Sequence, residues 1–350
     1  MAATIKDIAQ EAGVSIATVS RTLNKEDGVG PKTRQKIQAI ARKLKYFPNL
    51  QARSLVIRRP NAIGIIIPRT SEFAFSNPYY AEILKGISRR ARESEYYLVF
   101  SIAGEDSYAK IFHHQLAAGI IVLANRTDDS RIDEAWKMKV PMILIPGDSN
   151  KLYLPSVDID NFEGAFQAVD YLAGLGHCRI AFLNGLMNSK YSTERLLGYH
   201  KALEKYRLPY IANLVESLDF TQEAARVGMK RLLSLKKPPT AVLVMNDYSA
   251  MGALRAAKDM GWRVPEDISI IGFGDVPFAS MIDPPLTTIR EPFQEMGYEA
   301  ADRLLKMIQG DRLSQRHLIF PNELVIRQST APPPNKINLI QKRLPPLRVA

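Results

Sequence analysis

The chain begins MAATIKDIAQEAGVSIATVSRTLN, residues 1–24, and this stretch contains two short helical patterns on either side of Gly13. Thr4 and Asp7 have the spacing of a helix N-cap and its reciprocal partner. Apolar residues then recur with helical spacing at Ile5, Ile8, Ala9 and Ala12. Gly13 can adopt the left-handed conformation that ends a helix, and Ser15 can cap the next one. The stretch therefore predicts two helices joined by a tight turn.

The second helix is predicted to run from Ser15 to about Leu23, and its two faces differ in character. Its inward positions are Val14, Val19 and Leu23, whereas its outward positions are Ile16, Ala17, Ser20 and Arg21. A third helix is expected after Gly30, with Pro31 at its first position and an apolar stripe at Ile37, Ile40, Ala41 and Leu44. This arrangement is typical of a helix-turn-helix, whose second helix lies in the DNA major groove.

The positive charge of the chain is concentrated at its two ends. Residues 1–59 contain 12 Lys and Arg against 4 Asp and Glu, and residues 331–350 contain 4 basic residues and no acidic one. Residues 60–330 contain 31 basic and 32 acidic residues. A near-neutral body behind a cationic first segment indicates a separate module that binds a polyanion. A solvated basic terminus is the alternative interpretation of the same composition.

The stretch T-I-K-D-I-A-x-x-A-G-V-S-x-x-T-V-S-R-x-L-N resembles the first domain of the lactose/galactose repressor (LacI/GalR) family of bacterial transcriptional regulators. The resemblance implies that bases are read by Ile16, Ala17 and Arg21. The planar fork of Arg21 matches the O6 and N7 of guanine, and a phosphate contact is the alternative. Ile16 and Ala17 can offer only apolar contacts, for example to a thymine methyl. Phosphate anchors or caps are expected at Thr4, Ser15, Thr18, Ser20 and Asn24.

A short segment after the third helix reads PNLQARSL, residues 48–55. Asn49 can cap a helix of about two turns with Ala52 and Leu55 on one face, and so short a helix is marginal alone in water. The resemblance implies a hinge helix that folds when two subunits meet over DNA, with paired leucines, here Leu55, wedged into the minor groove. Arg53 is expected to add a phosphate contact. An ordinary linker is the alternative interpretation.

From Ala62 the pattern changes to short apolar runs that alternate with helical stretches. Strands are expected at 63–67, 97–101, 119–123, 142–145, 179–183, 241–245 and 268–273. Helices are expected at about 78–94, 161–174, 193–206, 221–235, 247–260 and 293–309. Continuous apolar strands indicate parallel sheets covered on both faces, and the alternation is typical of a doubly wound α/β arrangement. It occurs twice, which predicts two lobes with a cleft between them and resembles the periplasmic sugar-binding-protein fold.

The predicted architecture is an all-α helix-turn-helix head and a hinge helix, joined to an α/β two-lobed body of two doubly wound parallel sheets. The predicted boundaries are 1–47 for the DNA-binding head, 48–60 for the hinge helix and linker, and 61–330 for the effector-binding and dimerisation body. The N-lobe is expected at about 61–158 and 292–321, and the C-lobe at about 159–290 and 322–330. The tail, residues 331–350, is basic and rich in proline; it is too interrupted for a tetramerisation coiled coil, so a homodimer is expected.

Motifs of the body match the same family, and the resemblance covers roughly residues 4–328. They are N-P-Y-Y at 77–80, G-H-x-x-I at 176–180, R-L-x-G at 195–198, N-D-x-x-A-x-G at 246–252 and P-P-L-T-T-I at 284–289. Ligands of open α/β sheets bind beyond the carboxyl ends of the strands. The candidate effector-binding residues near these ends are Tyr79, Tyr80, Arg195, Phe220, Asn246 and Asp275. Their polar groups and aromatic faces suit a sugar, and a purine-like corepressor is the alternative.

One position departs from the family pattern. Where the family motif G-[FY]-D-D has its first acid, this sequence reads Gly272-Phe273-Gly274-Asp275. The substitution removes the carboxylate that the family uses at this point, and Asp275 either takes over its role or is structural. For Asp247, a helix cap is favoured over a ligand group.

The sequence does not favour an enzyme. It contains no P-loop, no G-x-S-x-G elbow, no metal-spaced His/Cys cluster, and no G-x-G-x-x-G after the first predicted strand, and no cofactor is expected. The single cysteine, Cys178, excludes an intrachain disulfide, fits a reducing compartment and is expected to be a buried structural thiol. The sequence has no visible leader or membrane-length apolar run, so a cytoplasmic protein is expected rather than an exported solute receptor.

The sequence therefore predicts a homodimeric, sequence-specific transcriptional repressor that binds double-stranded operator DNA. Two heads are expected to read two half-sites of a pseudo-palindrome. A small effector in the body cleft, with a sugar inducer favoured, is expected to change the angle between the lobes and so the spacing of the hinges. A sugar-modifying enzyme and a solute receptor are the alternatives from other classes.

Overall fold

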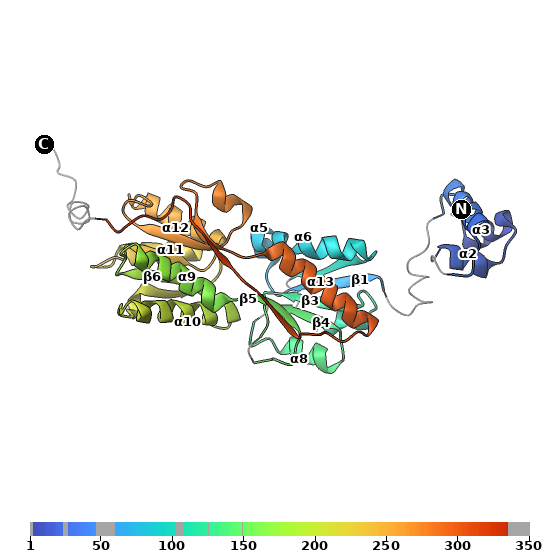
Figure 1. Ribbon diagram of the computed structural model, residues 1–350, viewed down its shortest axis with the longest axis horizontal. Coiled ribbons are helices and arrows are strands. Elements are labelled where there is room, and N and C mark those ends of the chain that lie inside the picture. The colour runs from blue at the N-terminus through green and yellow to red at the C-terminus, as the bar shows by residue number, and fades with distance from the viewer. Residues whose placement is uncertain are drawn as a thin grey trace. The chain divides into compact units, whose positions relative to one another are not determined.

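The structure is a computed structural model that describes residues 3–23, 27–46, 60–102, 108–124, 126–148 and 150–334. It divides into two compact units, Met1–Pro60 and Asn61–Ala350. The first unit contains the helical head, and the second is the α/β body, whose two lobes are visible in Figure 1.

The head consists of three helices, α1 (Ile5–Ala12), α2 (Ile16–Leu23) and α3 (Pro31–Lys43), which confirms the prediction. Thr4 and Asp7 form the expected capping box, and Gly13 ends α1 with a φ of 68°. Ser15 Oγ accepts a hydrogen bond from the Thr18 amide at 3.1 Å and so caps α2. The buried core consists of Ile8, Ala9, Ala12, Val19, Ile37, Ile40 and Ala41. Local caps and one shared core thus define the three-helix arrangement.

Each lobe of the body has one six-stranded sheet. In the N-lobe the strand order is β11-β5-β4-β3-β1-β2, and all pairs are parallel. Its strands are β1 (Ala62–Ile67), β2 (Tyr97–Ile102), β3 (Gly119–Leu123), β4 (Met142–Ile145), β5 (Ser156–Ile159) and β11 (His317–Phe320). In the C-lobe the order is β12-β10-β9-β8-β6-β7, parallel except for the antiparallel pair β10–β12. Its strands are β6 (Ile180–Gly185), β7 (Val215–Leu218), β8 (Ala241–Val244), β9 (Ser269–Gly274), β10 (Thr287–Arg290) and β12 (Glu323–Val325).

Helices cover both faces of each sheet, which explains the continuous apolar runs. In β1, Ile63 and Ile65 belong to one buried cluster with α6, whereas Ile66 belongs to another with α7 and α8. The N-lobe helices are α5 (Ser71–Ser76), α6 (Pro78–Glu93), α7 (Ala109–His113), α8 (Ser130–Lys137) and α13 (Phe293–Gln309). The C-lobe helices are α9 (Asn161–Gly174), α10 (Lys190–Lys205), α11 (Gln222–Leu233) and α12 (Asp247–Asp259). The doubly wound prediction is confirmed for both lobes.

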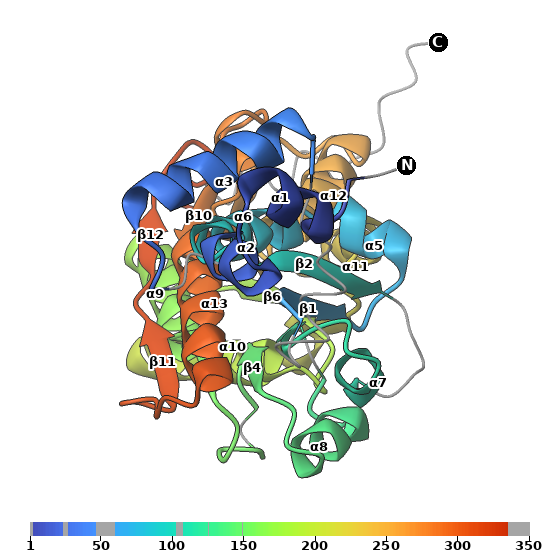
Figure 2. The same ribbon diagram turned by 90° about the vertical axis from the view of Figure 1, so that its right-hand side faces the viewer.

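The chain passes between the lobes three times, from β5 to α9, from β10 to α13 and from β11 to β12. Figure 1 shows the last of these segments running along both lobes, and Figure 2 shows α13 and β11 on the near side of the body. Glycines allow close helix pairing: a Cβ on Gly86 of α6 would lie 1.9 Å from the Gln294 carbonyl oxygen at α13. The three connections place the carboxyl ends of both sheets toward the interface between the lobes.

Candidate functional site

The outer face of α2 carries the residues that were predicted to read bases. Ile16, Ala17 and Arg21 are exposed, and their spacing puts them on one face of the helix. Ser20 is half-buried beside them. The hydroxyls of Ser15 and Thr18 contact each other at 2.9 Å, and Thr4 Oγ1 donates to Asp7 at 2.8 Å. The predicted Asn24, Asn49, Ala52, Arg53 and Leu55 lie outside the described residues.

A cavity lies between the two lobes of the body and is lined from both of them. The space between its walls, counted together with the open solvent at its mouth, is about 650 Å³. Eight of its lining residues are aromatic: Phe73, Tyr79, Tyr80, Tyr191, Phe220, Tyr248, Phe273 and Phe293. The other lining residues are Arg69, Asn77, Ala124, Ser189, Arg195, Met245, Asn246, Asp247, Val276 and Glu291. The cavity therefore combines apolar ring faces with a few charged and amide groups.

Five of the six predicted effector residues line this cavity: Tyr79, Tyr80, Arg195, Phe220 and Asn246. They come from both lobes because the carboxyl ends of both sheets face it. Burial raises the pKa of Tyr79, and it raises the pKa of Tyr80 to about 12, so both hydroxyls stay protonated. The Tyr79 hydroxyl lies 3.3 Å from the hydroxyl of Tyr191, which joins the N-lobe to the C-lobe at the cavity wall.

Arg195 is held rigidly in the cavity wall. Its Nε donates to Asn161 Oδ1 at 3.0 Å, its Nη1 to the Met245 carbonyl at 2.6 Å and its Nη2 to Glu291 Oε1 at 2.7 Å. The guanidinium carbon lies 3.5 Å from the centre of the Phe273 ring. The residue is only 4% exposed, so its orientation is fixed before any ligand enters. A preorganised guanidinium of this kind can direct its remaining hydrogen-bonding capacity at one ligand group.

Glu291 is a lining residue that the sequence analysis missed. One carboxylate oxygen pairs with Arg195, whereas Oε2 is buried and has no hydrogen-bond partner among the described residues. Burial raises the pKa of this carboxyl to about 7, against the opposing effect of Arg195. The residue directly follows β10, so the rule of carboxyl strand ends selects it once Thr287–Arg290 is recognised as a strand. This oxygen is a candidate acceptor for a donor group of a ligand.

The prediction that Asp247 caps a helix is wrong, because Asn246 is the cap of α12. Asn246 Oδ1 accepts the Ser249 amide at 2.7 Å. The Asp247 carboxylate is fully buried and accepts the Thr288 hydroxyl at 2.6 Å and the Val276 amide at 3.0 Å. Burial raises its pKa to about 6. Asp247 thus ties α12 to β10 and to the loop after β9, and this contact supports the cavity wall.

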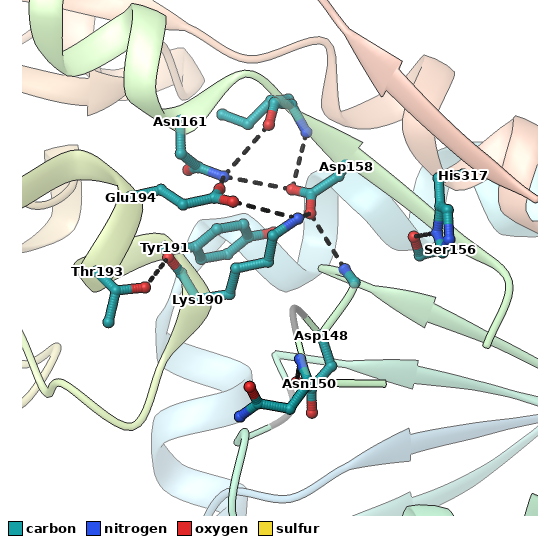
Figure 3. A network of polar contacts seen from close by, with 12 residues as sticks. Asp148, Asn150, Ser156, Asp158, Asn161, Lys190, Tyr191, Thr193, Glu194 and His317 are labelled. Carbon is teal, nitrogen blue, oxygen red and sulfur yellow. Dashed lines mark hydrogen bonds and ion pairs between the residues drawn. The ribbon is translucent and has the colours of Figure 1, made fainter. Parts of the chain in front are cut away.

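A second polar network joins the lobes beside the cavity (Figure 3). Asp158 of β5 in the N-lobe binds Lys190 at the start of α10 in the C-lobe, with the Oδ2 and Nζ atoms 2.5 Å apart. Asn161 Nδ2 donates to Asp158 Oδ1 at 3.3 Å and to Glu194 Oε2 at 3.2 Å. Since Asn161 also holds Arg195, the interlobe ion pair and the cavity belong to one connected network.

Comparisons with known proteins agree with both halves of this description. Residues 4–49 match the family described as bacterial regulatory proteins, lacI family, and residues 169–330 match a periplasmic binding protein-like domain. The HTH-type transcriptional repressor CytR of Escherichia coli (strain K12) is 37% identical over 335 residues, which cover 94% of this chain and 96% of that protein. The chain belongs to the lacI family. It is a DNA-binding transcriptional regulator.

Other relatives of this lacI-family regulator are regulators as well. The HTH-type transcriptional regulator DegA of Bacillus subtilis (strain 168) is 33% identical over 340 residues, covering 95% of this chain and 99% of that protein. The lac repressor dimer bound to operator and the anti-inducer ONPF has a TM-score of 0.83 at 30% identity, with 95% and 100% of the two chains covered. The CelR–cellobiose complex has a TM-score of 0.72 at 29% identity, with 93% and 99% covered.

At Gly274, where the sequence analysis expects a departure from the family motif, the backbone of this lacI-family regulator suits glycine. Gly274 has a φ of 131°, which L side chains rarely adopt. A Cβ there would lie 3.3 Å from the Phe293 ring and 3.4 Å from Asp247 Oδ2. Asp275 does not line the cavity: its carboxylate accepts Arg290 Nε at 2.8 Å and Arg327 Nη2 at 2.5 Å. Of the two interpretations given for Asp275, its contacts therefore correspond to the structural one.

Metal ligands, membrane-spanning helices and the single cysteine of the lacI-family regulator can also be checked in the structure. Among the residues that the structure describes, no group of three His, Cys, Asp or Glu is arranged to hold a metal ion. In the same part of the chain, no helix has the length and apolar character needed to cross a membrane. Cys178 is exposed, so the prediction of a buried thiol is wrong; the buried apolar run that follows it starts β6 at Ile180, two residues further along the chain.

Proposed function

We propose that this regulator is a cytoplasmic, homodimeric repressor whose binding to an operator is controlled by a small ligand in the cavity between the lobes. The observation that carries the proposal is the composition of the cavity wall, to which both lobes contribute fixed polar and aromatic side chains. A ligand that touches both lobes binds one lobe angle better than another. By linkage, ligand and DNA then change each other's affinity by the same factor.

The head is proposed to read the operator through the exposed face of α2. Arg21 is assigned to a guanine, and Ile16 and Ala17 to apolar contacts with bases. Leu55 of the hinge is assigned to the minor-groove step between two half-sites. Support comes from the lac repressor, whose structure is described as a dimer bound to operator.

A second copy of the chain is proposed to cover apolar surface of the N-lobe. Tyr97 and Phe100 are exposed on β2, which is the edge strand of its sheet, and Phe75 of α5 is 78% exposed. Exposed apolar side chains along an unpaired edge favour association. Dimerisation also supplies the two heads that a pseudo-palindromic operator requires.

A sugar is the effector class that we favour, with Arg195, Asn246 and Glu291 as its polar contacts. Polyols need such groups next to an aromatic face, and the aromatic lining supplies it. The solved relatives include a complex with cellobiose and one with bound ribose, at TM-scores of 0.72 and 0.69. A purine-like ligand remains the second candidate, because the eight aromatic residues equally suit a planar ring.

DNA binding is tested by band-shift experiments on the upstream region of the chain's own gene. Arg21→Ala is expected to cost about 1–3 kcal/mol of the binding free energy that discriminates between bases at one operator position. Discrimination at the other operator positions should not change. Lys36 is an exposed cation of the same helical head and provides the matched control. Lys36→Ala is expected to weaken binding to all DNA sequences alike, or not at all. Equal losses on every sequence for Arg21→Ala would contradict base reading.

The hinge and the effector have separate tests. Leu55→Gly is expected to weaken operator binding while the body stays folded, and an unchanged operator Kd would contradict the wedge. Thermal unfolding in the presence of monosaccharides, disaccharides and nucleobases is expected to show a raised Tm with a true effector, since it binds only the folded state. A hit that leaves operator affinity unchanged would contradict the proposed control by ligand.

A further inference from the structure

Two arginines lie at one side of the cavity, where β1 and β3 end. Arg69 lines the cavity and is held by two backbone carbonyls: Nη1 donates to Pro68 and Nη2 to Ala124, each at 2.6 Å. These carbonyls follow β1 and β3, so the guanidinium is fixed at the carboxyl edge of the N-lobe sheet. This is the edge where α/β sheets bind their ligands.

Arg126 follows β3, two residues after Ala124, whose carbonyl holds Arg69. Its Nη1 donates to Asn188 Oδ1 of the C-lobe at 2.8 Å, and its guanidinium carbon lies 5.4 Å from the centre of the Phe220 ring, which lines the cavity. Burial lowers the pKa of Arg126 to about 10, and the positive charge of Arg69 is the next largest cause. The Tyr80 hydroxyl is under the influence of both guanidinium groups. Arg69 in the cavity wall and Arg126 at the lining ring of Phe220 therefore bring two cations to the carboxyl edge of the N-lobe sheet.

Neither arginine has a carboxylate partner within 4.0 Å among the described residues, unlike Arg195, which pairs with Glu291. Asp128 and Asp219 also act on Arg126, but both are exposed and neither reaches ion-pair distance. Two half-buried guanidinium groups that repel each other, with no carboxylate within 4.0 Å in the described part of the chain, favour an anion nearby. An anion between them would relieve this repulsion and accept charge-assisted hydrogen bonds.

We propose that Arg69 and Arg126 form a subsite for an anionic group of the effector, of the phosphate-ester or carboxylate type. This inference rests on the proposed function, since it concerns the same cavity, and it narrows the effector from a neutral sugar to an anionic one such as a sugar phosphate or a sugar acid. The planar fork of arginine matches both kinds of oxyanion. The free Oε2 of Glu291 then accepts a hydrogen bond from a hydroxyl or N–H group elsewhere on the same ligand.

Inorganic phosphate is the probe that tests this subsite, with the full-length chain and tryptophan fluorescence as the readout. The two tryptophans, Trp136 and Trp262, both lie in the body, so the signal is blind to phosphate bound by the cationic head. With phosphate up to about 100 mM, compared with chloride at equal ionic strength, the Tm of the wild-type body is expected to rise by about 2–4 °C beyond the general salting effect.

Three variants locate the effect. Arg126→Gln removes the charge but keeps an amide donor for Asn188, and Arg69→Gln removes the other charge. In each of these two variants, most of the phosphate-dependent rise in Tm is expected to be lost. The matched control, Arg312→Gln, changes an exposed arginine and measures the general effect of phosphate on stability.

Equal phosphate-dependent rises in wild type, Arg126→Gln and Arg312→Gln would overturn the anionic subsite, as would no rise in the wild type. Arg126→Gln decides the matter if Arg69→Gln does not fold. A second experiment distinguishes a phosphate ester from a carboxylate by comparing the binding of glucose 6-phosphate and glucuronate with that of glucose. The wild type is expected to bind one of the two anions about tenfold more tightly than glucose, and this difference in affinity should be smaller in Arg126→Gln. If a neutral sugar releases the operator equally well from wild type and Arg126→Gln, the proposed function holds and this inference fails.

Discussion

The buried carboxyl of Glu291 makes the stability of the body depend on pH, and Glu291→Gln is the change that isolates it. The pKa is raised from an ordinary value of 4.5 to about 7 because the group is buried. Between these values the folded body retains a proton that the unfolded chain has released. Stability is therefore lost as the pH rises through the folded pKa. Glutamine cannot ionise, and its amide oxygen can still accept the hydrogen bond from Arg195.

The size of the effect follows from the two pKa values. From about pH 6 to about pH 8, Glu291 is expected to reduce the free energy of unfolding by an amount on the order of 1 kcal/mol. Asp247, whose pKa is raised from 3.8 to about 6, has already ionised over much of this range and is expected to contribute less than Glu291. Glu291→Gln should therefore lose less stability than the wild type over this range, by roughly 1 kcal/mol.

Urea unfolding followed by the fluorescence of Trp136 and Trp262 measures this difference in the body. Glu204→Gln, an exposed carboxyl on α10, serves as the matched control and should keep the pH dependence of the wild type. Parallel pH profiles for wild type and Glu291→Gln would refute the reasoning, because the carboxyl would then ionise in the folded and unfolded states alike.

Three further predictions address the head, a helix pair and the contact between the lobes. Ile8→Ala, at a fully buried position, is expected to lower the free energy of unfolding of the head by about 2–5 kcal/mol. Operator binding should then be lost in a band-shift, while the tryptophan-monitored unfolding of the body stays unchanged. A change in both would contradict two separate units. Gly86→Ala places a Cβ 1.9 Å from the Gln294 carbonyl oxygen, so it is expected to lower the free energy of unfolding by an amount on the order of 3 kcal/mol and with it the urea midpoint; a midpoint equal to that of the wild type would argue against this packing. Asn188→Ala removes the hydrogen bond from Arg126 and should speed amide exchange at residue 127, whose N–H donates to the carbonyl of residue 188 at 3.0 Å; unchanged exchange would show that the side chain does not hold the lobes together.

Much of the fold could be predicted because its signals are local. The helices of the head follow from a capping box, a left-handed Gly13 and an apolar stripe, all within a few residues of one another. Most of the strands that were predicted have continuous apolar runs, such as Ile63–Ile67, because helices cover both of their faces; β2 was also predicted, although Tyr97 and Phe100 are exposed on it. The sequence-based prediction missed five strands, β5, β7, β10, β11 and β12. It also missed the short helices α5, α7 and α8. β5, for example, reads Ser-Val-Asp-Ile, a polar and apolar alternation of only four residues.

The candidate effector site was predicted in outline, because the carboxyl ends of parallel strands must meet at one edge of a sheet. That rule selected Arg195 and Asn246, which line the cavity. It also selected Asp275, whose side chain turns to two arginines of its own lobe. A rule about strand ends fixes where the backbone lies, whereas the direction of each side chain depends on partners that are far away in the sequence.

The sequence by itself determined the helix-turn-helix, the alternation of strands and helices, and the family to which the chain belongs, since each rests on short-range spacing. Only the tertiary structure decided which groups act together. Arg195 is held by residues 34, 50 and 96 positions away in the chain, and Glu291 has a free oxygen only because Arg195 takes the other one. The physical reason is that burial and charge pairing depend on three-dimensional distance, which spacing along the chain does not contain.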